Sequence, residues 1–369
     1  MVCLDVPWPA DYGGAIDMMN RIKAFYETGI NIHLHYFSYN NRGTPKELEN
    51  YCKTVQTYER KSFKESYNLK IPYIVASRIN ARLIENLNKD NHPVLLEGLH
   101  TTGIIPYISK TNRKICVRQH NDEAVYYKEL AKSTFNFVKK AYYTRESTLI
   151  KKYQKTLPHN VSYACITHDD CKRMLKLGYT NVVHVPAFAN WQKVDAQEGI
   201  GNLCLFHGNL SVSENEKAAL WLLCNVFNKV RVPFVIAGKN PSKRLVKAAQ
   251  LCQHTCIISN PTNEELNDLI QKAHINILPL LNKHVTGIRL KLLHALYKGR
   301  HCVVNQAMVS GTNLEAACHI GNNADALASI ISQLYYMPFN DEEILLRKNL
   351  LEAQFNNQQN IPLFTNLLW

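Results

Sequence analysis

Apolar residues near the start of the chain recur at helical spacing. Between residues 15 and 28 they fall at Ala15, Met18, Met19, Ile22, Phe25 and Tyr26. This spacing predicts an amphipathic helix, which Gly29 can end with a left-handed conformation. An apolar run at 2–6 and a loop rich in proline and glycine precede the helix, and an alternating strand at 30–37 follows it. Strand, glycine loop, helix and strand form a βαβ unit, so the opening predicts a parallel sheet.

The alternation of strands and helices continues through the first half of the chain. Apolar runs at 94–96 and 114–117 predict strands, and residues 125–142 predict one long helix. A last strand ends this half, and residues 187–201 lack periodicity, which is typical of a linker. We therefore expect a first Rossmann-like domain at 1–186.

A second series of alternating elements follows the linker. The pattern predicts strands at 203–206, 232–237, 256–258, 275–278 and 302–304, and helices at 213–227, 242–252, 262–272 and 288–298. The fold class is therefore α/β, with a second doubly wound Rossmann-like domain at 202–345. A helical segment at 346–369 follows, for which a return to the first domain is one arrangement. Two such domains are expected to face each other across a cleft, with the carboxyl ends of their strands on its walls.

Length and composition narrow the class of protein. A chain of 369 residues that is 46% hydrophobic can bury two cores. Its longest apolar stretches fall short of the ~20 residues that cross a bilayer, and its first residues carry no signal-peptide pattern, so a cytoplasmic location is expected. The eleven cysteines are scattered without a CxxC spacing. This favours reduced, mostly buried thiols over a disulfide framework or a structural zinc site.

A formal net charge of +13 indicates an anionic partner. The basic residues are spread along the whole chain without a dense tract or a nucleic-acid-binding pattern, so nucleic acid is the weakest option. Phosphorylated small molecules and an acidic membrane surface fit the charge equally well. His33 and His35 fall on one face of a predicted strand, but the sequence shows no partnering ligand. A half-solvated strand face is favoured there, and no metal is expected.

The strongest local pattern lies at 285–299. A helix that begins near Gly287 places Lys291, His294 and Lys298 on one polar face. Arg289 and Lys291 would then lie in the first turn, where the helix dipole disfavours positive charge. A bound phosphate reverses that cost, because the free backbone N–H groups, the dipole and two cations would all face one anion. The alternative is a solvated basic face, and the diphosphate site is the favoured interpretation.

Polar residues also follow other predicted strands at their carboxyl ends. These candidates are His100, Arg118, His120, Gly208, Asn209 and Lys239, and the opening loop adds Gly13 and Gly14. Each alone is an ordinary turn, cap or structural residue. Their shared layer at the strand ends indicates a ligand site. His120 has ring nitrogens that can donate or accept a hydrogen bond, so its side chain suits a hydroxyl or a leaving-group oxygen.

The chain resembles the GT-B glycosyltransferases of family 4, particularly bacterial enzymes of cell-envelope polysaccharide biosynthesis. The resemblance runs nearly end to end through PADYGGAIDM, EGLHTTG, RQHNDE, FHGNLSVSEN, FVIAGKNP and GIRLKLLHALYKGRHCVVN. It implies a hexosyltransferase-like enzyme that moves a sugar, with retention, from a nucleoside diphosphate sugar to a hydroxyl of a glycan or lipid-linked acceptor. It implies no cofactor and no metal, and a place in the cytoplasm with peripheral association at the inner membrane face.

The resemblance also assigns roles. His120 is expected against the transferred sugar, and Arg289 and Lys291 against the diphosphate, which makes these three the catalytic candidates. Donor binding is expected from Gly13, Gly14, Gly208, Asn209, Lys239, Gly287 and His294. The acceptor side is expected to include His100 and Arg118.

The chain departs from the family at two positions. Many relatives carry a pair of glutamates around this helix, and Thr286 and His294 stand at the matching positions. A neutral histidine accepts one hydrogen bond from a ribose hydroxyl, but it lacks the bidentate geometry of a carboxylate. Two alternatives therefore stay open: a catalytically impaired GT-B protein that binds a glycan or nucleotide, and a nucleotide-sugar epimerase.

Overall fold

The computed structural model describes residues 1–38, 42–108, 112–134, 136–281, 287 and 289–369. The described chain forms two compact units. The first comprises Met1–Asn190, Gly287 and Phe355–Trp369, and the second comprises the described residues from 191 to 281 and from 289 to 354. The chain therefore passes from the first unit to the second at Asn190 and returns after Gln354.

The described part of the first unit contains a seven-stranded parallel sheet in the order β3-β2-β1-β4-β5-β6-β7. The strands are β1 Val2–Cys3, β2 His33–Ser38, β3 Thr54–Glu59, β4 Val94–Glu97, β5 Ile115–Gln119, β6 Ser162–Cys165 and β7 Val182–His184. The helices are α1 Gly13–Glu27, α2 Phe63–Ser66, α3 Tyr73–Ala76, α4 Ala81–Leu87, α5 Ile105–Ile108, α6 Glu123–Ser133, α7 Phe137–Gln154, α8 His168–Lys176 and α16 Asn357–Leu368, and 3₁₀ turns lie at Lys46–Asn50 and Leu99–Ile104.

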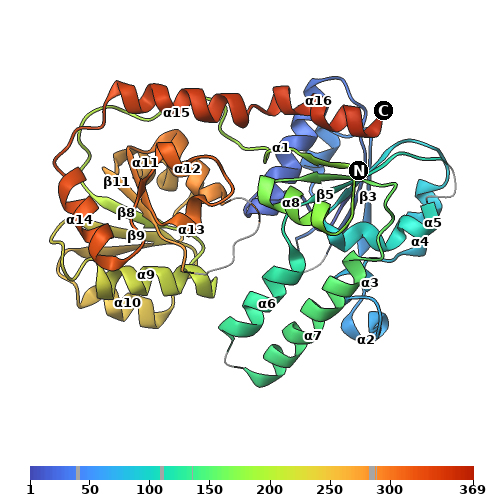
Figure 1. Ribbon diagram of the computed structural model, residues 1–369, viewed down its shortest axis with the longest axis horizontal. Coiled ribbons are helices and arrows are strands. Elements are labelled where there is room, and N and C mark those ends of the chain that lie inside the picture. The colour runs from blue at the N-terminus through green and yellow to red at the C-terminus, as the bar shows by residue number, and fades with distance from the viewer. Residues whose placement is uncertain (39–41, 109–111, 135, 282–286, 288) are drawn as a thin grey trace. The chain divides into compact units, whose positions relative to one another are not determined.

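Successive residues of each central strand serve opposite faces of this sheet. Leu95 belongs to the core formed with α1 and α16, whereas Leu96 belongs to the core on the other face. Helix α16 packs beside α1, where Phe25 and Phe364 meet edge to face with ring centroids 6.0 Å apart (Figure 1). A sheet covered on both faces explains why its central strand β4 is a continuous apolar run rather than an alternating one.

The long helix expected at 125–142 is wrong. The chain forms α6 and α7 there, two helices that pack side by side (Figure 1). Thr134 leaves the helical region with φ of −92° and ψ of 137°, and the Asn136 side chain accepts the N–H of Lys139 as an N-cap. Thr134 therefore ends one helix and Asn136 begins the next, and helical periodicity alone does not reveal this break.

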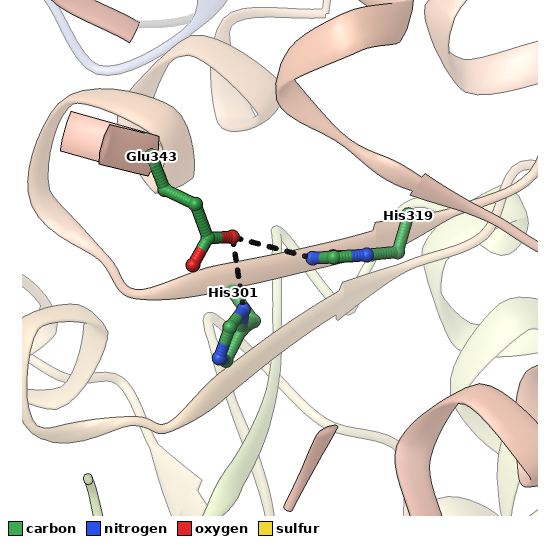
Figure 2. A group of neighbouring side chains, drawn as sticks. All are labelled: His301, His319 and Glu343. Carbon is green, nitrogen blue, oxygen red and sulfur yellow. Dashed lines mark ion pairs between the residues drawn. The ribbon is translucent and has the colours of Figure 1, made fainter. Parts of the chain in front are cut away.

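The described part of the second unit contains a six-stranded parallel sheet in the order β10-β9-β8-β11-β12-β13. The strands are β8 Cys204–His207, β9 Phe234–Gly238, β10 Thr255–Ser259, β11 Ile275–Leu278, β12 His301–Val304 and β13 His319–Ile320. The helices are α9 Ser213–Asn225, α10 Lys243–Gln250, α11 Asn263–Lys272, α12 Leu290–Lys298, α13 Gln306–Val309, α14 Ala324–Leu334 and α15 Asp341–Gln354, with a 3₁₀ turn at Glu315–Ala317. Side chains from β12, β13 and α15 meet at His301, His319 and Glu343 (Figure 2).

The helix start expected near Gly287 is also wrong. Helix α12 begins at Leu290 with Arg289 as its N-cap, so Gly287 precedes the helix. Gly287 has a φ of 67°, a left-handed value that glycine adopts easily and that no right-handed helix contains. Lys291 is therefore the second residue of the helix and still lies in its first turn.

The structure also tests the predictions for the cysteines, for the two strand histidines and for membrane-spanning helices. The eleven cysteines, all within the described ranges, are free thiols, and six of them are buried, as the scattered spacing predicts. The half-solvated strand face is wrong for His35, which is buried with Nδ1 2.9 Å from the Tyr58 hydroxyl, because β3 lies beside it. No helix in the described ranges is long and apolar enough to span a bilayer.

Candidate functional site

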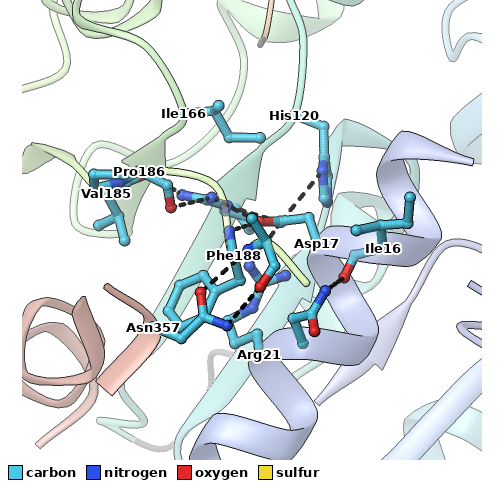
Figure 3. Close-up of polar contacts among 12 residues, drawn as sticks. Ile16, Asp17, Arg21, His120, Ile166, Val185, Pro186, Phe188 and Asn357 are labelled. Atoms are coloured by element: carbon cyan, nitrogen blue, oxygen red, sulfur yellow. Dashed lines mark hydrogen bonds and ion pairs between the residues drawn. The ribbon is translucent and has the colours of Figure 1, made fainter. Parts of the chain in front are cut away.

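A buried network of ion pairs lies at the carboxyl ends of the central strands in the first unit (Figure 3). Helix α1 contributes Asp17 and Arg21 from successive turns, 2.7 Å apart between Oδ2 and Nη1. Arg118 of β5 donates through Nη2 to Asp17 Oδ1 at 3.1 Å, and the N–H of Phe188 donates to the same oxygen at 2.7 Å. Asp17 thus holds a helix, a strand and the segment after β7 together.

Glu97 ends β4 and binds the other side of this network. Its Oε1 accepts from Arg21 Nη2 at 2.6 Å, and its Oε2 lies 2.7 Å from His120 Nε2. The second ring nitrogen of His120, Nδ1, lies 3.7 Å from Asp17 Oδ2. Both ring nitrogens therefore face carboxylates, and this fixes the orientation of the imidazole just beyond the end of β5.

The network balances its own charge. Two carboxylates, Asp17 and Glu97, face two guanidiniums, Arg21 and Arg118, and the four side chains are fully or almost fully buried. Burial alone would raise the pKa of Asp17, but Arg118 and Arg21 hold it well below its usual range. Burial opposes ionisation of Glu97 as well, and Arg21 and His120 lower its pKa. Both carboxylates are therefore ionised at neutral pH.

A metal does not fit this network. Asp17, Glu97 and His120 bring ligand atoms within 4.8 Å of one another. However, both oxygens of Asp17 and Oε1 of Glu97 already accept hydrogen bonds from buried guanidiniums, and a divalent cation there would face two positive charges at short range. The cluster instead holds the His120 ring in one orientation.

Sequence reasoning selected Arg118 and His120 but missed Asp17, Arg21 and Glu97 as their partners. A signal exists in α1, where Asp17 and Arg21 are four residues apart in a helix whose other residues between 15 and 25 are mostly apolar. Charged residues are rarely buried unless they are paired, so an acidic and a basic residue inside an apolar stripe indicate an internal ion pair.

The other candidates of the first unit lie around the same sheet edge. Gly13 and Gly14 open α1, whose N-cap residue Tyr12 makes no side-chain cap and whose first turn contains no acidic residue. His100 lies half-buried in the turn after β4, where burial and nearby Arg78 hold its pKa well below its usual range. Arg118 is fully buried and also donates to the carbonyls of Val185 and Pro186, so it is built into the fold rather than exposed to an acceptor.

In the second unit, Lys291 projects from the first turn of α12 toward the carboxyl end of β8. Its Nζ donates to Asn215 Oδ1 at 2.9 Å and lies 5.1 Å from the centre of the Phe206 ring. Neither partner carries negative charge. Burial lowers the pKa of Lys291 to about 8, with Glu214 raising it and Arg289 lowering it further. The Lys291 ammonium thus donates to a neutral amide at a helix N-terminus, where Arg289 adds positive charge and the Glu214 carboxylate offsets part of it. An anionic ligand would be favoured at this position.

The loop after β8 is organised around Asn215. Its Nδ2 donates to the carbonyl of Asn209 at 2.9 Å, while its Oδ1 accepts from Lys291. Gly208 permits this approach, since a Cβ there would lie 3.1 Å from the Asn215 amide. The Asn209 side chain stays within the loop and accepts from Ser211, and Lys239 is exposed after β9. Gly208, Asn209 and Lys291 are thus brought together, with Asn215 as the link.

His294 lies one turn beyond Lys291 on α12 and is held on two sides. Its ring stacks on Trp191 with centroids 4.4 Å apart, and its Nε2 lies 2.5 Å from Asn267 Oδ1 of α11. Burial lowers the pKa of His294 to about 3, so the imidazole is neutral under ordinary conditions. His207, at the end of β8, meets the same ring edge to face at 5.9 Å.

Two further positions named from the sequence, Gly287 and Thr286, precede α12. Gly287 belongs to the first unit, where its N–H lies 3.4 Å from Asp170 Oδ2 and a Cβ would meet the carbonyl of His120 at 2.5 Å. It is therefore not part of the same cluster as Lys291 within the second unit. Thr286 lies outside the described residues.

Solved structures share the fold over nearly their whole length. A glycosyltransferase from Rickettsia africae is 13% identical with a TM-score of 0.66, covering 100% of this chain and 98% of that one. The UDP-forming α,α-trehalose-phosphate synthase of Burkholderia xenovorans is 12% identical with a TM-score of 0.66 (100% and 99%). Anabaena HepE, solved with UDP, is 9% identical with a TM-score of 0.63 (99% and 99%). The expected GT-B fold of two α/β units with parallel sheets is confirmed.

No family model matches the sequence. A curated protein of Klebsiella pneumoniae, described as an uncharacterized 44.6 kDa protein in the cps region, is 31% identical over 313 residues. The match covers 80% of this chain and 79% of that protein. Identity at this level over most of both chains reflects a shared fold and shared ancestry, and the chain belongs to the family of this cps-region protein of Klebsiella pneumoniae.

Proposed function

We propose that this protein is a retaining glycosyltransferase of the family 4 type. It transfers a sugar, of the hexosyl class, from a nucleoside diphosphate sugar to a hydroxyl of a glycan or lipid-linked acceptor in cell-envelope polysaccharide synthesis. The GT-B fold and the cps-region relative support this class of reaction. The proposal includes a cytoplasmic protein that associates peripherally with the inner membrane face, which suits a lipid-linked acceptor and a net charge of +13.

The observation that carries the proposal is the environment of Lys291. Its ammonium is half-buried in the first turn of α12, binds a neutral amide and has a pKa lowered to about 8. Evolution retains such a destabilised cation most readily where a ligand supplies the missing charge. We assign the donor diphosphate to Arg289 and Lys291, which neutralise the charge that develops on the leaving group without a metal or another cofactor.

The remaining roles follow from position. In this proposal His120, mounted on Glu97 and Asp17, contacts the transferred sugar, and the loop containing Gly208 and Asn209 lines the donor site with Lys239. Gly13 and Gly14 expose the N-terminus of α1 to phosphate, Gly287 allows close approach near His120, and His100 lies on the acceptor side. Arg118 acts through Asp17, as a positioning residue.

A nucleotide-sugar panel tests the proposal. We expect one or a few nucleoside diphosphate sugars to raise the melting temperature, since a ligand at 100 times its Kd stabilises the folded state by about 2.7 kcal/mol. Two of the similar structures are named for UDP chemistry, so UDP-sugars are the first arm and GDP-sugars the second. The same donor should then transfer its sugar to a polyprenyl-linked or oligosaccharide acceptor without added divalent cation, with product anomers assigned by NMR.

The panel also separates the alternatives. Stabilisation without transfer to any acceptor would indicate a binding protein that has lost catalysis. Release of an epimer or a free sugar with no acceptor present would indicate an epimerase. An absence of stabilisation by every nucleoside diphosphate and nucleotide sugar would overturn the assignment of a donor site.

His294 gives a second, smaller prediction. Because its pKa is about 3, the ring stays neutral from pH 5 to 8 and can offer one acceptor to a ribose hydroxyl. His294→Ala should raise the donor KM about fivefold, the value of one hydrogen bond of about 1 kcal/mol, with kcat within about twofold. The ratio of wild-type to variant kcat/KM should not change between pH 5 and 7. A ratio that follows a titration in that range would show that His294 acts as a charged group.

A further inference from the structure

A second cluster of titratable groups, His301, His319 and Glu343, lies in the second unit (Figure 2). The two histidines begin their strands, whereas Lys291 lies near the carboxyl end of β8. His301 is the first residue of β12 and is 2% exposed. Its Nε2 lies 3.0 Å from the carbonyl oxygen of Met337. A carbonyl only accepts hydrogen bonds, so Nε2 carries the proton, and in the neutral ring Nδ1 bears a lone pair.

This lone pair faces another acceptor. His301 Nδ1 is buried and makes no hydrogen bond to any residue that the structure describes, yet Glu343 Oε1 lies only 3.3 Å away. The same oxygen lies 3.6 Å from Nε2 of His319, the first residue of β13. The other carboxylate oxygen, Oε2, accepts from the backbone N–H of Asn340 at 3.4 Å, so Oε1 is the oxygen directed at both rings (Figure 2). The His301 lone pair, a ring nitrogen of His319 and a carboxylate oxygen thus converge on one point.

We propose that His301 Nδ1, His319 Nε2 and Glu343 Oε1 bind a zinc ion. Zinc bonds of ~2.0–2.2 Å in a tetrahedron separate neighbouring ligand atoms by about 3.3–3.5 Å, which matches the two observed spacings to within a few tenths of an ångström. Imidazole and carboxylate form a ligand set that zinc accepts, and the carbonyl behind His301 is the usual outer partner of a metal-bound histidine. Water would fill the fourth position, because His319 and Glu343 are each about one-third exposed.

The sheet register explains how residues so far apart in sequence meet. Strand β13 pairs with β12 so that His319 lies beside Val303. His301 and Val303 are two residues apart and share a face of the sheet, so both histidines lie on that face. Glu343 reaches it from the first turn of α15, where Asn340 accepts the Glu343 N–H at 3.0 Å and fixes the helix start.

The three proposed ligands lie near the edge of the second sheet. Strand β13 has two residues and lies at the edge of its sheet, so few backbone hydrogen bonds hold it. A metal shared by β12, β13 and α15 would fix this edge. His274 is not a ligand despite its ring contact with His301, because its Nδ1 accepts from Gly201 and its Nε2 faces the carbonyl of Leu334. Lys291 lies at the far end of α12, so the zinc takes no part in transfer.

Zinc titration of the full chain tests the site. After chelator treatment and dialysis, we expect one equivalent of zinc to bind in calorimetry with a weak competing chelator present. Cobalt(II) should give the visible bands of a tetrahedral nitrogen and oxygen site. His319→Ala and Glu343→Gln should each lower zinc affinity about 100-fold or more and remove the rise in melting temperature that zinc causes. His254→Ala removes an exposed histidine from the same unit and should bind zinc as the wild type does.

The competing explanation is a protonated His301 paired with Glu343 and no metal. It predicts no stoichiometric zinc in the wild type, and equal melting temperatures with and without zinc for every variant. That result would overturn the proposal. So would zinc binding that both His319→Ala and Glu343→Gln retain, because the metal would then reside elsewhere. Circular dichroism on both variants, whose side chains are partly exposed, checks that they are folded.

Discussion

Replacement of Lys291 with methionine is expected to lower kcat/KM for the nucleotide sugar about 100- to 1,000-fold, because one preorganised charge on a developing anion contributes roughly that much. Methionine keeps most of the aliphatic stem that packs at Phe206 and removes only the ammonium. Steady-state kinetics at saturating acceptor measure the effect. The matched control is Lys298→Met, on the same helix, where Nζ is paired with Asp195 at 2.6 Å and activity should stay within about twofold.

Without a bound donor, removal of the Lys291 ammonium should not lower the free energy of unfolding. Burial lowers the pKa of Lys291 from its ordinary 10.5 to about 8, so the folded state disfavours the charged form. This penalty is fully present below pH 8 and disappears as pH rises from about 8 to 10.5. Lys291→Met should therefore melt no lower than the wild type at pH 7 in the absence of donor. Lower stability together with lost activity would mean that the lysine supports the fold rather than a ligand.

The same pKa sets a pH dependence for donor use. Above pH 8 the free enzyme loses the Lys291 proton. The kcat/KM for the donor should then decrease with pH, and the decrease should approach a factor of ten per pH unit. Lys291→Arg keeps a charge that does not titrate, so its profile should stay flat to about pH 10 even though its activity is lower. Identical alkaline limbs in the wild type and Lys291→Arg would assign that limb to another group.

The sequence predicts the fold well because buried parallel strands leave a simple pattern. Apolar runs separated by helical periodicity predict the α/β alternation, and the GT-B fold is confirmed. Local chemistry limits the prediction of boundaries. Asn136 caps a new helix within a stretch that periodicity predicts to be a single helix. Gly287 has a left-handed conformation, and α12 begins only at Leu290.

Sites are harder to predict because their partners come from distant segments. Helix-start and strand-end patterns in the sequence indicate Lys291 and His120. Their partners, Asn215 and Glu97, come from other elements, and only the order of the strands in each sheet brings them close. The proposed zinc ligands are separated in sequence by 18 residues (301 to 319) and by 24 residues (319 to 343). This spacing matches no compact metal-binding motif. Only the register of β12 and β13 brings the two histidines onto one face.

The buried network of the first unit gives the second large prediction. Asp17→Asn keeps the shape of the side chain but leaves Arg21 with Glu97 alone and removes the carboxylate that pairs with Arg118. Removal of one partner from a buried charge network typically costs about 3–5 kcal/mol, because the remaining charges stay desolvated. Hydrogen exchange should report this loss in peptides of α1 and β5 but not in α12 or β12, since the two units have separate cores.

The control for this variant is Asp169→Asn, which removes an exposed carboxylate whose pair with Lys172 spans 3.5 Å on α8. Its effect should be within about 1 kcal/mol. Asp17 and Glu97 have lowered pKa values in the folded state, so their stabilisation is complete above the unfolded carboxyl pKa of ~4. It is lost as pH falls below that value, and Asp17→Asn should flatten this acid limb in the first unit. Equal losses from Asp17→Asn and Asp169→Asn would mean that the network contributes no more than a surface pair. Asp17 and Glu97 are the carboxylates that contact the His120 ring. That result would therefore also mean that the network does not hold this ring rigidly.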